Sequence, residues 1–381
     1  MIKYNQPDIN KRDLISVQNV LKSNNLTQGK EIYEFEKSLK VYCNSKYAKV
    51  VNSATSALHL SCLSLGVGRG DFVWMPGITF VSDANSAIFC GAKVKFIDID
   101  KSTFNISEIE LEKELVKAKK SKKLPKAIIV VHLGGNPCNL KKIKKLSIKY
   151  NFKIIEDASH ALGSIYEKSK IGSCKYSNLT VFSFHALKNI TTGEGGAVLT
   201  NDKEIDKKIN LLRSHGINRH KFKKRESWYY EQDLLGYNYR LTNFQAALGL
   251  SQIKRLNSFL KKRNLIANRY SKLFSNKIHI QKINDNCFSA YHLFIILLPP
   301  KIKRKVYYDL KKNGIQSSFH YMPIYKHPYH KKANKLKLKN CEFYNSRALS
   351  LPIHTHIKFA DQLKIVKIIT DVKETKNFVT L

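Results

Sequence analysis

The stretch TVFSFHALKNITTGEGGAVLTN, residues 180–201, decides how the rest of the chain is interpreted. Its two ends, 180–184 and 197–200, are apolar runs that are typical of buried strands. Between them stand Lys188 and a glycine-rich turn, GEGG at 193–196. Burying an amine is costly unless the protein uses it, and a frequent use is a Schiff base to a carbonyl group. A lysine at the tip of a loop in a βαβ protein is the alternative, and this segment alone leaves both interpretations open.

Before and after this stretch, short apolar runs predict strands and a 3.6-residue periodicity predicts helices. The predicted strands are 47–51, 72–75, 93–97, 127–132 and 153–155, and the predicted helices are 11–21, 31–42, 57–65, 80–89, 106–119, 140–150 and 203–212. Such alternation is typical of βαβ units and a mainly parallel sheet, which binds ligands at the carboxyl ends of its strands.

The pattern changes after residue 243, where one long amphipathic helix is predicted over 243–267. Strands at 290–298 and 316–320 follow it, with helices on either side, which is an α+β pattern. We therefore predict a large domain over residues 11–248 and a small C-terminal domain over 249–381, with residues 1–10 packing nearby. The basic and aromatic segment 220–230 is predicted to be an excursion over a site.

Composition narrows the classes of function. The chain has 381 residues, of which 43% are hydrophobic, which is enough for two globular domains. The scattered cysteines and the absence of a leader or a long apolar run predict a cytoplasmic protein without a membrane span. The net charge of +38 suggests nucleic acid as a partner. However, the lysines lie along nearly every amphipathic segment and form no basic stripe with interleaved aromatic residues, so we expect no specific nucleic-acid binding.

Two further segments predict ligand contacts. Asp157 directly follows a predicted strand and would face the ligand crevice, although Asp is also a common helix N-cap. The turn Ser53-Ala54-Thr55 leads from a strand into a helix, where backbone N–H groups and hydroxyls can bind an anion. Simple capping by Ser53 or Thr55 is the alternative there. Phe80 could stack on a ring or be an ordinary core aromatic residue.

Taken together, these groups match pyridoxal phosphate, whose aldehyde, ring nitrogen and phosphate need an amine, a carboxylate and an anion site. Lys188 supplies the amine and can move a proton between carbons as general acid and base. Asp157 can keep the ring nitrogen protonated. The strand-to-helix turn, together with Ser183, can hold the phosphate.

The sequence gives weaker indications of two other kinds of site, a metal site and a dinucleotide-binding turn. His327 and His330 are three residues apart, and His354 and His356 are two apart, but no carboxylate or cysteine cluster completes a metal site, so we expect no metal. The GEGG turn lacks the Gly-x-Gly-x-x-Gly spacing of a dinucleotide-binding turn and precedes a strand rather than a helix.

The motifs NSATSALHL, EDASHALGS, SFHALKNITTGEGGAVLTND and GYNYRLTNFQAALGLSQ resemble the DegT-type sugar aminotransferase family, in the family's order and spacing. This resemblance implies the fold-type I aspartate aminotransferase architecture and pyridoxal 5'-phosphate as cofactor. It implies that Lys188 is the Schiff-base lysine, that Asp157 pairs with the ring nitrogen and that His160 lies near the cofactor's 3-hydroxyl. The remaining implied cofactor contacts are Ala54, Thr55 and Ser183 at the phosphate, Phe80 on the ring, and Asn238 reaching the phosphate of the neighbouring subunit in a homodimer.

The resemblance also implies a reaction. A dehydratase subgroup of the family carries His at the position of Lys188, so lysine here favours amino transfer from glutamate to a nucleotide-linked keto-sugar. LKSNNLTQGK, LLRSHGINR and SSFHYMPIY are most similar to the family's branch for pseudaminic acid synthesis, which aminates C4 of a UDP-linked 4-keto-6-deoxy-N-acetylhexosamine. The expected substrate contacts are His320, Tyr321 and Tyr325, and charge and position add Lys30 and Arg240. The alternatives are amination at C3, a dTDP- or GDP-linked sugar, or a non-catalytic regulator with the same fold.

Overall fold

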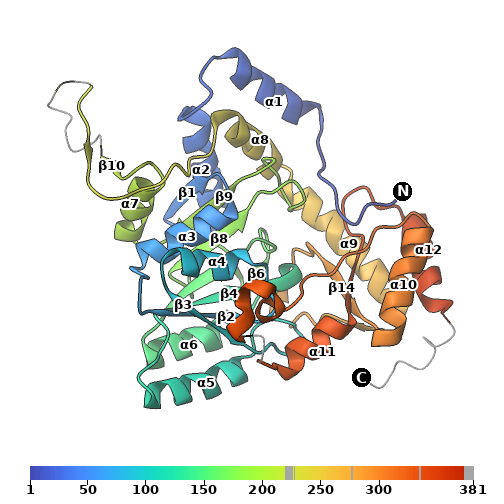
Figure 1. The fold of residues 1–381 in the computed structure, drawn as a ribbon. Coiled ribbons are helices and arrows are strands. Elements are labelled where there is room, and N and C mark those ends of the chain that lie inside the picture. Colours follow the sequence, from blue (N-terminus) through green and yellow to red (C-terminus); the bar gives the residue numbers. More distant parts are fainter. Residues whose placement is uncertain (219–225, 227, 276–277, 334–335, 373–381) are drawn as a thin grey trace.

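The computed structural model describes residues 1–218, 226, 228–275, 278–333 and 336–372 (Figure 1). Its centre is a seven-stranded sheet with the order β1-β9-β8-β5-β4-β2-β3. The strands from β3 to β8 in this order run parallel, whereas β9 is antiparallel to both of its neighbours. The mainly parallel sheet is therefore confirmed. The strands are β1 (Tyr47–Val51), β2 (Phe72–Pro76), β3 (Lys93–Ile97), β4 (Ala127–Val131), β5 (Lys153–Asp157), β8 (Leu179–Ser183) and β9 (Gly196–Thr200).

Helices cover both faces of this sheet, which explains why central strands such as β4 are apolar throughout. In β4, Ile128 and Val130 belong to one hydrophobic core and Ile129 and Val131 to the other, because successive side chains point to opposite faces. The first core also contains residues of α2 (Lys30–Cys43), α5 (Glu108–Lys120) and α6 (Leu140–Tyr150). The second contains residues of α3 (Ala54–Ser64), α4 (Ser82–Phe89) and α7 (Lys203–Leu212).

The long helix predicted over 243–267 is wrong, because the chain forms two helices, α8 (Asn243–Ile253) and α9 (Leu256–Phe274). They are separated by a turn at Lys254 and Arg255. The guanidinium of Arg255 donates to Asp8 at 2.7 Å and to Asp13 at 2.5 Å. These tertiary partners lie far away in sequence, so the local periodicity gave no sign of the break. We propose that the small domain begins near this turn, close to the expected boundary at 249.

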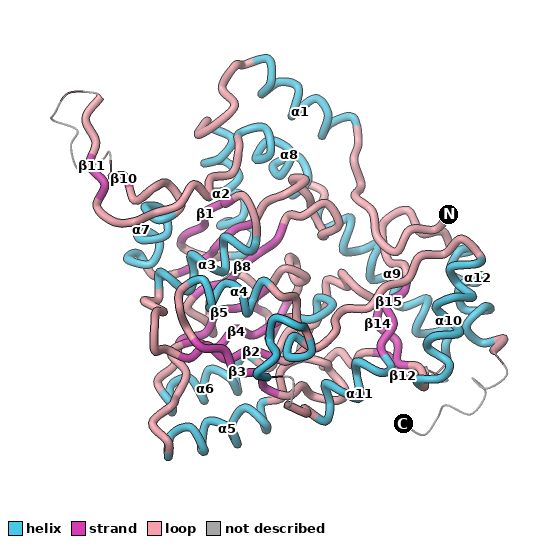
Figure 2. Tube along the Cα trace, viewed as in Figure 1, coloured by secondary structure: helices cyan, strands magenta, loops and turns pink. Residues whose placement is uncertain are grey.

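The C-terminal part forms a separate three-stranded antiparallel sheet with helices around it, as Figure 2 shows by its separate group of magenta strands. The predicted strand 290–298 is shorter in the structure, and 316–320 is not a strand: Ser318 forms only an isolated bridge with Ser350. The elements are β12 (His279–Ile280), β14 (Phe294–Leu297), β15 (Ala348–Leu351), α10 (Pro300–Lys312), α11 (Lys339–Arg347) and α12 (Phe359–Thr370).

The N-terminal segment crosses from this C-terminal part towards the central sheet before α1 (Lys11–Lys22) begins. Ile2 forms a parallel bridge with Ile315, and the backbone carbonyl of Lys3 contacts Nε2 of His354 at 3.1 Å. The N-terminal end accordingly lies beside α12 in Figure 1.

Two small sheets were not predicted from the sequence. One joins β13 (Cys287–Phe288), β6 (Ile165–Tyr166) and β7 (Ser169–Lys170), and the other joins β10 (Ile217–Asn218) and β11 (Glu231–Gln232). Most of the predicted excursion at 220–230 lies outside the described residues. No helix within the described ranges combines the length and the apolar character that crossing a bilayer requires.

Candidate active site

A cavity of about 450 Å³ lies at the carboxyl ends of the central strands. The last residues of β4, β5 and β8, which are Val131, Asp157 and Ser183, all line it, and Lys188 lines it from the loop after β8. This is the edge where parallel sheets bind ligands. Nine of the thirteen residues predicted to form the site line this cavity: Ala54, Thr55, Phe80, Asp157, His160, Ser183, Lys188, His320 and Tyr321.

The Lys188 amine lies among groups that make protonation unfavourable. Burial lowers its pKa from 10.5 to about 8, and the nearby Asp157 carboxylate only partly opposes this effect. The loop that carries the amine is held by its own backbone and by the N-terminal segment, since Nδ2 of Asn5 donates to the carbonyl of Leu187 at 2.8 Å. The neutral form of this amine, which is the nucleophilic form, is therefore accessible near neutral pH.

The side chain of Asp157 is held by Ser159, which lies two residues further along the chain. The backbone N–H and the hydroxyl of Ser159 both donate to Oδ1 of Asp157, at 2.9 and 2.5 Å. Asp157 is only 5% exposed, yet it lines the cavity. A buried carboxylate with two fixed donors is suited to pair with a cationic group in the cavity.

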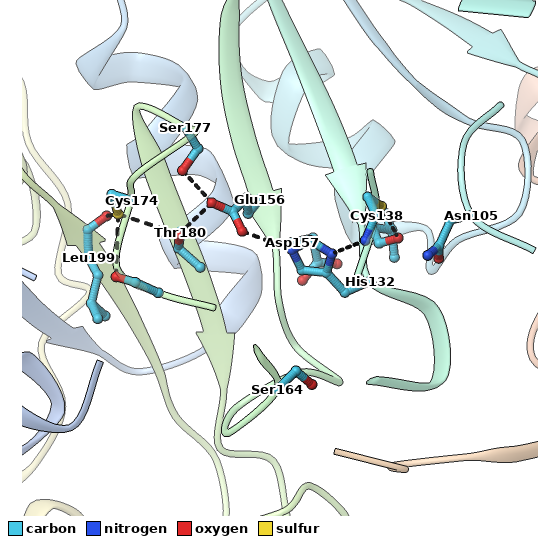
Figure 3. A network of polar contacts seen from close by, with 12 residues as sticks. Asn105, His132, Cys138, Glu156, Asp157, Ser164, Cys174, Ser177, Thr180 and Leu199 are labelled. Atoms are coloured by element: carbon cyan, nitrogen blue, oxygen red, sulfur yellow. Dashed lines mark hydrogen bonds and ion pairs between the residues drawn. The ribbon is translucent and has the colours of Figure 1, made fainter. Parts of the chain in front are cut away.

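Glu156, the preceding residue of β5, points to the opposite face and holds the strand from behind (Figure 3). One of its carboxylate oxygens accepts from the hydroxyls of Ser177 and Thr180, and the other lies 2.9 Å from Nε2 of His132. The backbone N–H of Cys138 donates to Nδ1 of His132 at 3.0 Å, so Nε2 carries the hydrogen that Glu156 accepts. The side chains of Ser177, Thr180 and His132 thus fix the strand that presents Asp157.

The turn before α3 places the N-terminus of a helix at the cavity. Ser53 is the N-cap, and its hydroxyl accepts from the N–H of Ser56 at 3.1 Å, so the capping alternative is observed as well. Helix geometry leaves the N–H groups of Ala54 and Thr55 without an intrahelical acceptor, and both residues line the cavity. A Cβ atom at Gly196 would lie 2.7 Å from the backbone nitrogen of Ala54, so β9 can pass this turn only with glycine there.

Aromatic and imidazole side chains form the opposite wall. Phe80 is 53% exposed and lines the cavity, so it is not a core residue, and its ring lies 5.8 Å from that of Tyr321. The Tyr321 hydroxyl lies 3.2 Å from Nε2 of His160, whose Nδ1 accepts from the N–H of Gly134 at 3.3 Å. Burial and the nearby Lys188 lower the pKa of His160 well below its usual value. The same two causes lower the pKa of His320 to about 4, so both rings are neutral at neutral pH.

Four predicted residues lie outside this cavity. The backbone of Asn238 pairs with that of Ser214, and Arg240 donates to the Ser214 hydroxyl at 3.2 Å and lines a second cavity of about 290 Å³. Lys30 is the exposed first residue of α2. Tyr325 is buried, and its hydroxyl donates to Glu342 at 2.9 Å.

Sequence reasoning missed several lining residues. Ser159 had a local signal, because an Asp followed two residues later by a serine is typical of a turn closed by the aspartate side chain. Tyr4 and His292 had none, because the tertiary fold alone brings the N-terminal segment and the start of the C-terminal sheet to the cavity.

Residues 7–370 match the DegT/DnrJ/EryC1/StrS aminotransferase family. The chain belongs to this family. The aminotransferase is 41% identical over 373 residues to a UDP-4-amino-4,6-dideoxy-N-acetyl-beta-L-altrosamine transaminase of Campylobacter jejuni, covering 96% of each chain. Its structure is similar to that of Helicobacter pylori PseC, an aminotransferase involved in the biosynthesis of pseudoaminic acid, with a TM-score of 0.87 and 34% identity over 98% of this chain and 99% of the other.

Pyridoxal phosphate is the cofactor of this aminotransferase. The "Putative sugar aminotransferase Spr1654" of Streptococcus pneumoniae has been solved in its PMP form and is similar to the whole chain, with a TM-score of 0.90 and 27% identity. The cavity fits the cofactor, because it combines an amine of lowered pKa, a buried carboxylate and a helix N-terminus beside an obligatory glycine. The expected fold-type I architecture and the expected enzyme class are confirmed by these relatives.

Proposed function

We propose that this aminotransferase moves the amino group of glutamate to C4 of a UDP-linked 4-keto-6-deoxy-N-acetylhexosamine, in the cytoplasm, for nonulosonic acid or surface-polysaccharide synthesis. The observation that carries the substrate assignment is the 41% identity to an altrosamine transaminase over 96% of both chains. Amino transfer itself is supported by Lys188 and Asp157, which line one cavity.

In this proposal, pyridoxal phosphate supplies a carbonyl that takes up the amino group and a ring that accepts electrons from the reacting carbon. Lys188 would hold the cofactor covalently and would act as general base and acid in the proton transfer. Asp157 would keep the ring nitrogen protonated. The N–H groups of Ala54 and Thr55 would hold the phosphate together with Ser183, and Phe80 would stack on the ring.

The neutral imidazoles on the opposite wall are proposed to orient neutral groups. Nδ1 of His160 accepts a backbone N–H, so its Nε2 carries the hydrogen and can donate towards Tyr321 or the cofactor's 3-hydroxyl. His320 and Tyr321 line the cavity from the C-terminal part and would contact the sugar.

A panel of sugar nucleotides tests the substrate assignment. UDP-, dTDP- and GDP-linked 4-keto- and 3-keto-sugars would be incubated with glutamate and the enzyme, and the products analysed by mass and by NMR to locate the new C–N bond. The expected product is the UDP-linked 4-amino sugar, and Lys188→Ala, which lacks the amine, should give none. Preferential amination at C3 or of a dTDP- or GDP-linked sugar would refute the assignment.

We also propose a homodimer in which each cavity is completed by the partner chain, because Asn238, Arg240 and Lys30 lie outside the cavity of their own chain. A mixing experiment tests this. Lys188→Ala and Asn238→Ala chains would be inactive alone, whereas a dimer of one chain of each type would contain one intact site. Activity recovered after the two variants are mixed and reassembled supports the proposal, and no recovery from verified mixed dimers contradicts it.

A further inference from the structure

Residues 237–240 form a short extended segment beside the turn that leads from β1 into α3. The N–H of Asn52, which directly follows β1, donates to the carbonyl of Tyr239 at 2.9 Å. The N–H of Tyr239 donates in turn to the carbonyl of Arg213, after α7, at 3.0 Å. The backbone of this segment is therefore held by two other parts of the chain.

The two tyrosines of the segment contact one buried side chain of α3. Their rings stack, with centroids 5.0 Å apart and planes at 15°. His59 of α3 is 3% exposed, and its ring centroid lies 4.9 Å from that of Tyr237. Nδ1 of His59 lies 3.2 Å from the hydroxyl of Tyr239, which is hydrogen-bonding distance. His59 thus holds both tyrosines against the helix.

The other two residues of the segment face away from α3, because successive side chains of an extended backbone point to opposite sides. Asn238 is exposed in the single chain, and Arg240 lines the second cavity, of about 290 Å³. Both are proposed above to complete the cavity of the partner chain. Anchoring the tyrosines on α3 therefore fixes the residues that would reach the partner.

We propose that His59 is a positioning residue for the site of the neighbouring subunit. By holding Tyr237 and Tyr239 against α3, it sets the place from which Asn238 reaches the cofactor phosphate of the partner. The same helix begins with the Ala54-Thr55 turn, which is proposed to hold the phosphate of its own chain, so α3 would serve both sites. This inference rests on the homodimer with shared cavities proposed above, whereas the contacts of His59 with the tyrosines do not.

Hydrogen exchange of the cofactor-free protein tests whether His59 holds the segment. The N–H groups of Tyr237 and Tyr239 donate to the carbonyls of Leu212 and Arg213, and they should exchange at least about threefold faster in His59→Leu, which loses the hydrogen bond. His59→Asn keeps a polar nitrogen near the position of Nδ1 and should exchange within about twofold of the parent protein. Unchanged exchange in His59→Leu overturns the proposal.

Two mixed dimers separate an effect on the partner's site from an effect within the same chain. Both carry Lys188→Ala in one chain, so only the other chain binds pyridoxal phosphate covalently. In the first dimer, His59→Leu is in the chain that keeps the lysine. In the second, it is in the chain with Lys188→Ala.

The affinity for the cofactor is measured in each dimer from the absorbance of the covalently bound form. It should be about fivefold lower in the second dimer than in a dimer that lacks His59→Leu, because the segment that reaches the intact site is then loosened. The first dimer should match the dimer that lacks His59→Leu. The opposite pattern, or no loss in either dimer, overturns the proposal.

A third mixed dimer tests the shared cavity itself. One chain carries both Asn238→Ala and Lys188→Ala, and the other is unchanged. Full cofactor affinity in this dimer refutes the shared cavity proposed above. Reduced affinity here, together with full affinity in the second dimer, refutes the role of His59 alone.

Tyr239→Phe takes the place of His59→Leu if that variant does not fold. It removes only the hydroxyl beside Nδ1 of His59 and should lower the affinity about threefold in the second dimer. Tyr42→Phe is the matched control, because the hydroxyl of Tyr42 also donates to one side chain, that of Asn257 at 3.0 Å, and Tyr42 does not line the active-site cavity. Equal affinities with Tyr239→Phe and Tyr42→Phe contradict the role of His59.

Discussion

At the scale of single residues, the burial of Lys188 affects both the reactivity of its amine and the stability of the fold. Burial lowers the pKa of its amine to about 8. Only the neutral amine attacks a carbonyl, so the rate at which the cofactor-free protein binds pyridoxal phosphate covalently should rise from pH 7 to about pH 9 and then level off. Stopped-flow absorbance of the bound cofactor measures this rate. A rate that keeps rising to pH 10.5 would show that the amine has an ordinary pKa.

The same burial should make the cofactor-free protein less stable than a variant with an uncharged side chain at position 188. Below pH 8 the lysine is charged in both the folded and the unfolded states, and the folded state bears the full desolvation cost. This cost disappears as the pH rises from about 8 towards 10.5, because the unfolded chain then binds more protons than the folded one. Lys188→Met should therefore raise the free energy of unfolding at pH 7 by roughly 1–3 kcal/mol, after allowance for the part of the side chain that faces the cavity.

Urea unfolding of cofactor-free protein at pH 7 and pH 10 checks this, and the gain should shrink at the higher pH. Lys207→Met, which removes an exposed partner of Glu204, is the control and should change the stability by less than about 0.5 kcal/mol. An equal effect of the two substitutions would contradict the expected cost at Lys188.

The residues most readily predicted from the sequence are those whose position depends on a neighbouring strand or turn. Asp157 follows a predicted strand, and the Ala54-Thr55 turn begins a helix, so local pattern placed both at one edge of the sheet. Ser183 lay inside the predicted strand 180–184, and the structure ends this strand at Ser183. Tyr325 shows the limit of such reasoning. Its segment was expected to contact substrate, but whether a tyrosine faces a cavity or packs behind its wall depends on tertiary contacts that a sequence pattern does not contain.

At the scale of elements, the polar cluster behind β5 leads to a prediction about stability. Glu156→Ala would leave His132, Ser177 and Thr180 without their shared acceptor in a buried site. Each unsatisfied buried polar group costs about 1–3 kcal/mol, so the free energy of unfolding should fall by roughly 3 kcal/mol or more.

Glu112→Ala is the matched control for the Glu156 substitution, because Glu112 pairs with Lys149 at 3.0 Å on the surface and should contribute less than about 1 kcal/mol. Chemical denaturation monitored by circular dichroism compares the two variants. If Glu156→Ala costs no more than Glu112→Ala, the cluster does not stabilise the strand.

The elements also show why some predictions succeeded and others did not. The predicted helix 140–150 has the bounds of α6, since its periodicity is local and Asn139 caps it. The antiparallel direction of β9 depends on the path of the loop that carries Lys188, and the break between α8 and α9 depends on Asp8 and Asp13, which are far away in the sequence. The segment 316–320 looks like a strand, yet the N–H of Gln316 donates to the carbonyl of Ile2 instead of a sheet partner.

At the scale of the whole molecule, the N-terminal segment connects the two parts of the chain at the site. Asn5 donates to Leu187 beside the lysine and accepts from Nη2 of Arg263 at 3.1 Å, and Arg263 also donates to the carbonyl of Ile353 at 2.9 Å. Asn5→Ala should lower the free energy of unfolding by about 1–3 kcal/mol, because it leaves the charged Arg263 and the Leu187 carbonyl short of partners.

Hydrogen exchange should locate the effect of the Asn5 substitution in residues 184–195 as well as near the N-terminus. Asn19→Ala on the exposed face of α1 is the control and should leave exchange in that loop unchanged. Unaltered exchange around Lys188 in Asn5→Ala would mean that the segment does not hold the loop.

The change from a mainly parallel sheet to a separate C-terminal sheet follows from a change in pattern along the chain, from βαβ units to α+β. The path of residues 2–5 could not be predicted, since short irregular segments take their position from single hydrogen bonds to residues hundreds of positions away, as with Arg263. The net charge of +38 follows from composition alone and gave no information about the site.

The position of Tyr4 in the cavity wall has a practical consequence for anyone producing this protein. A purification tag fused before Met1 would begin only a few residues from the active-site cavity. The side chains of the tag, or nickel bound to them, could enter or block the cavity. Rates measured with a tag or a fluorescent fusion should therefore be compared with rates of the same chain after the tag has been cleaved off.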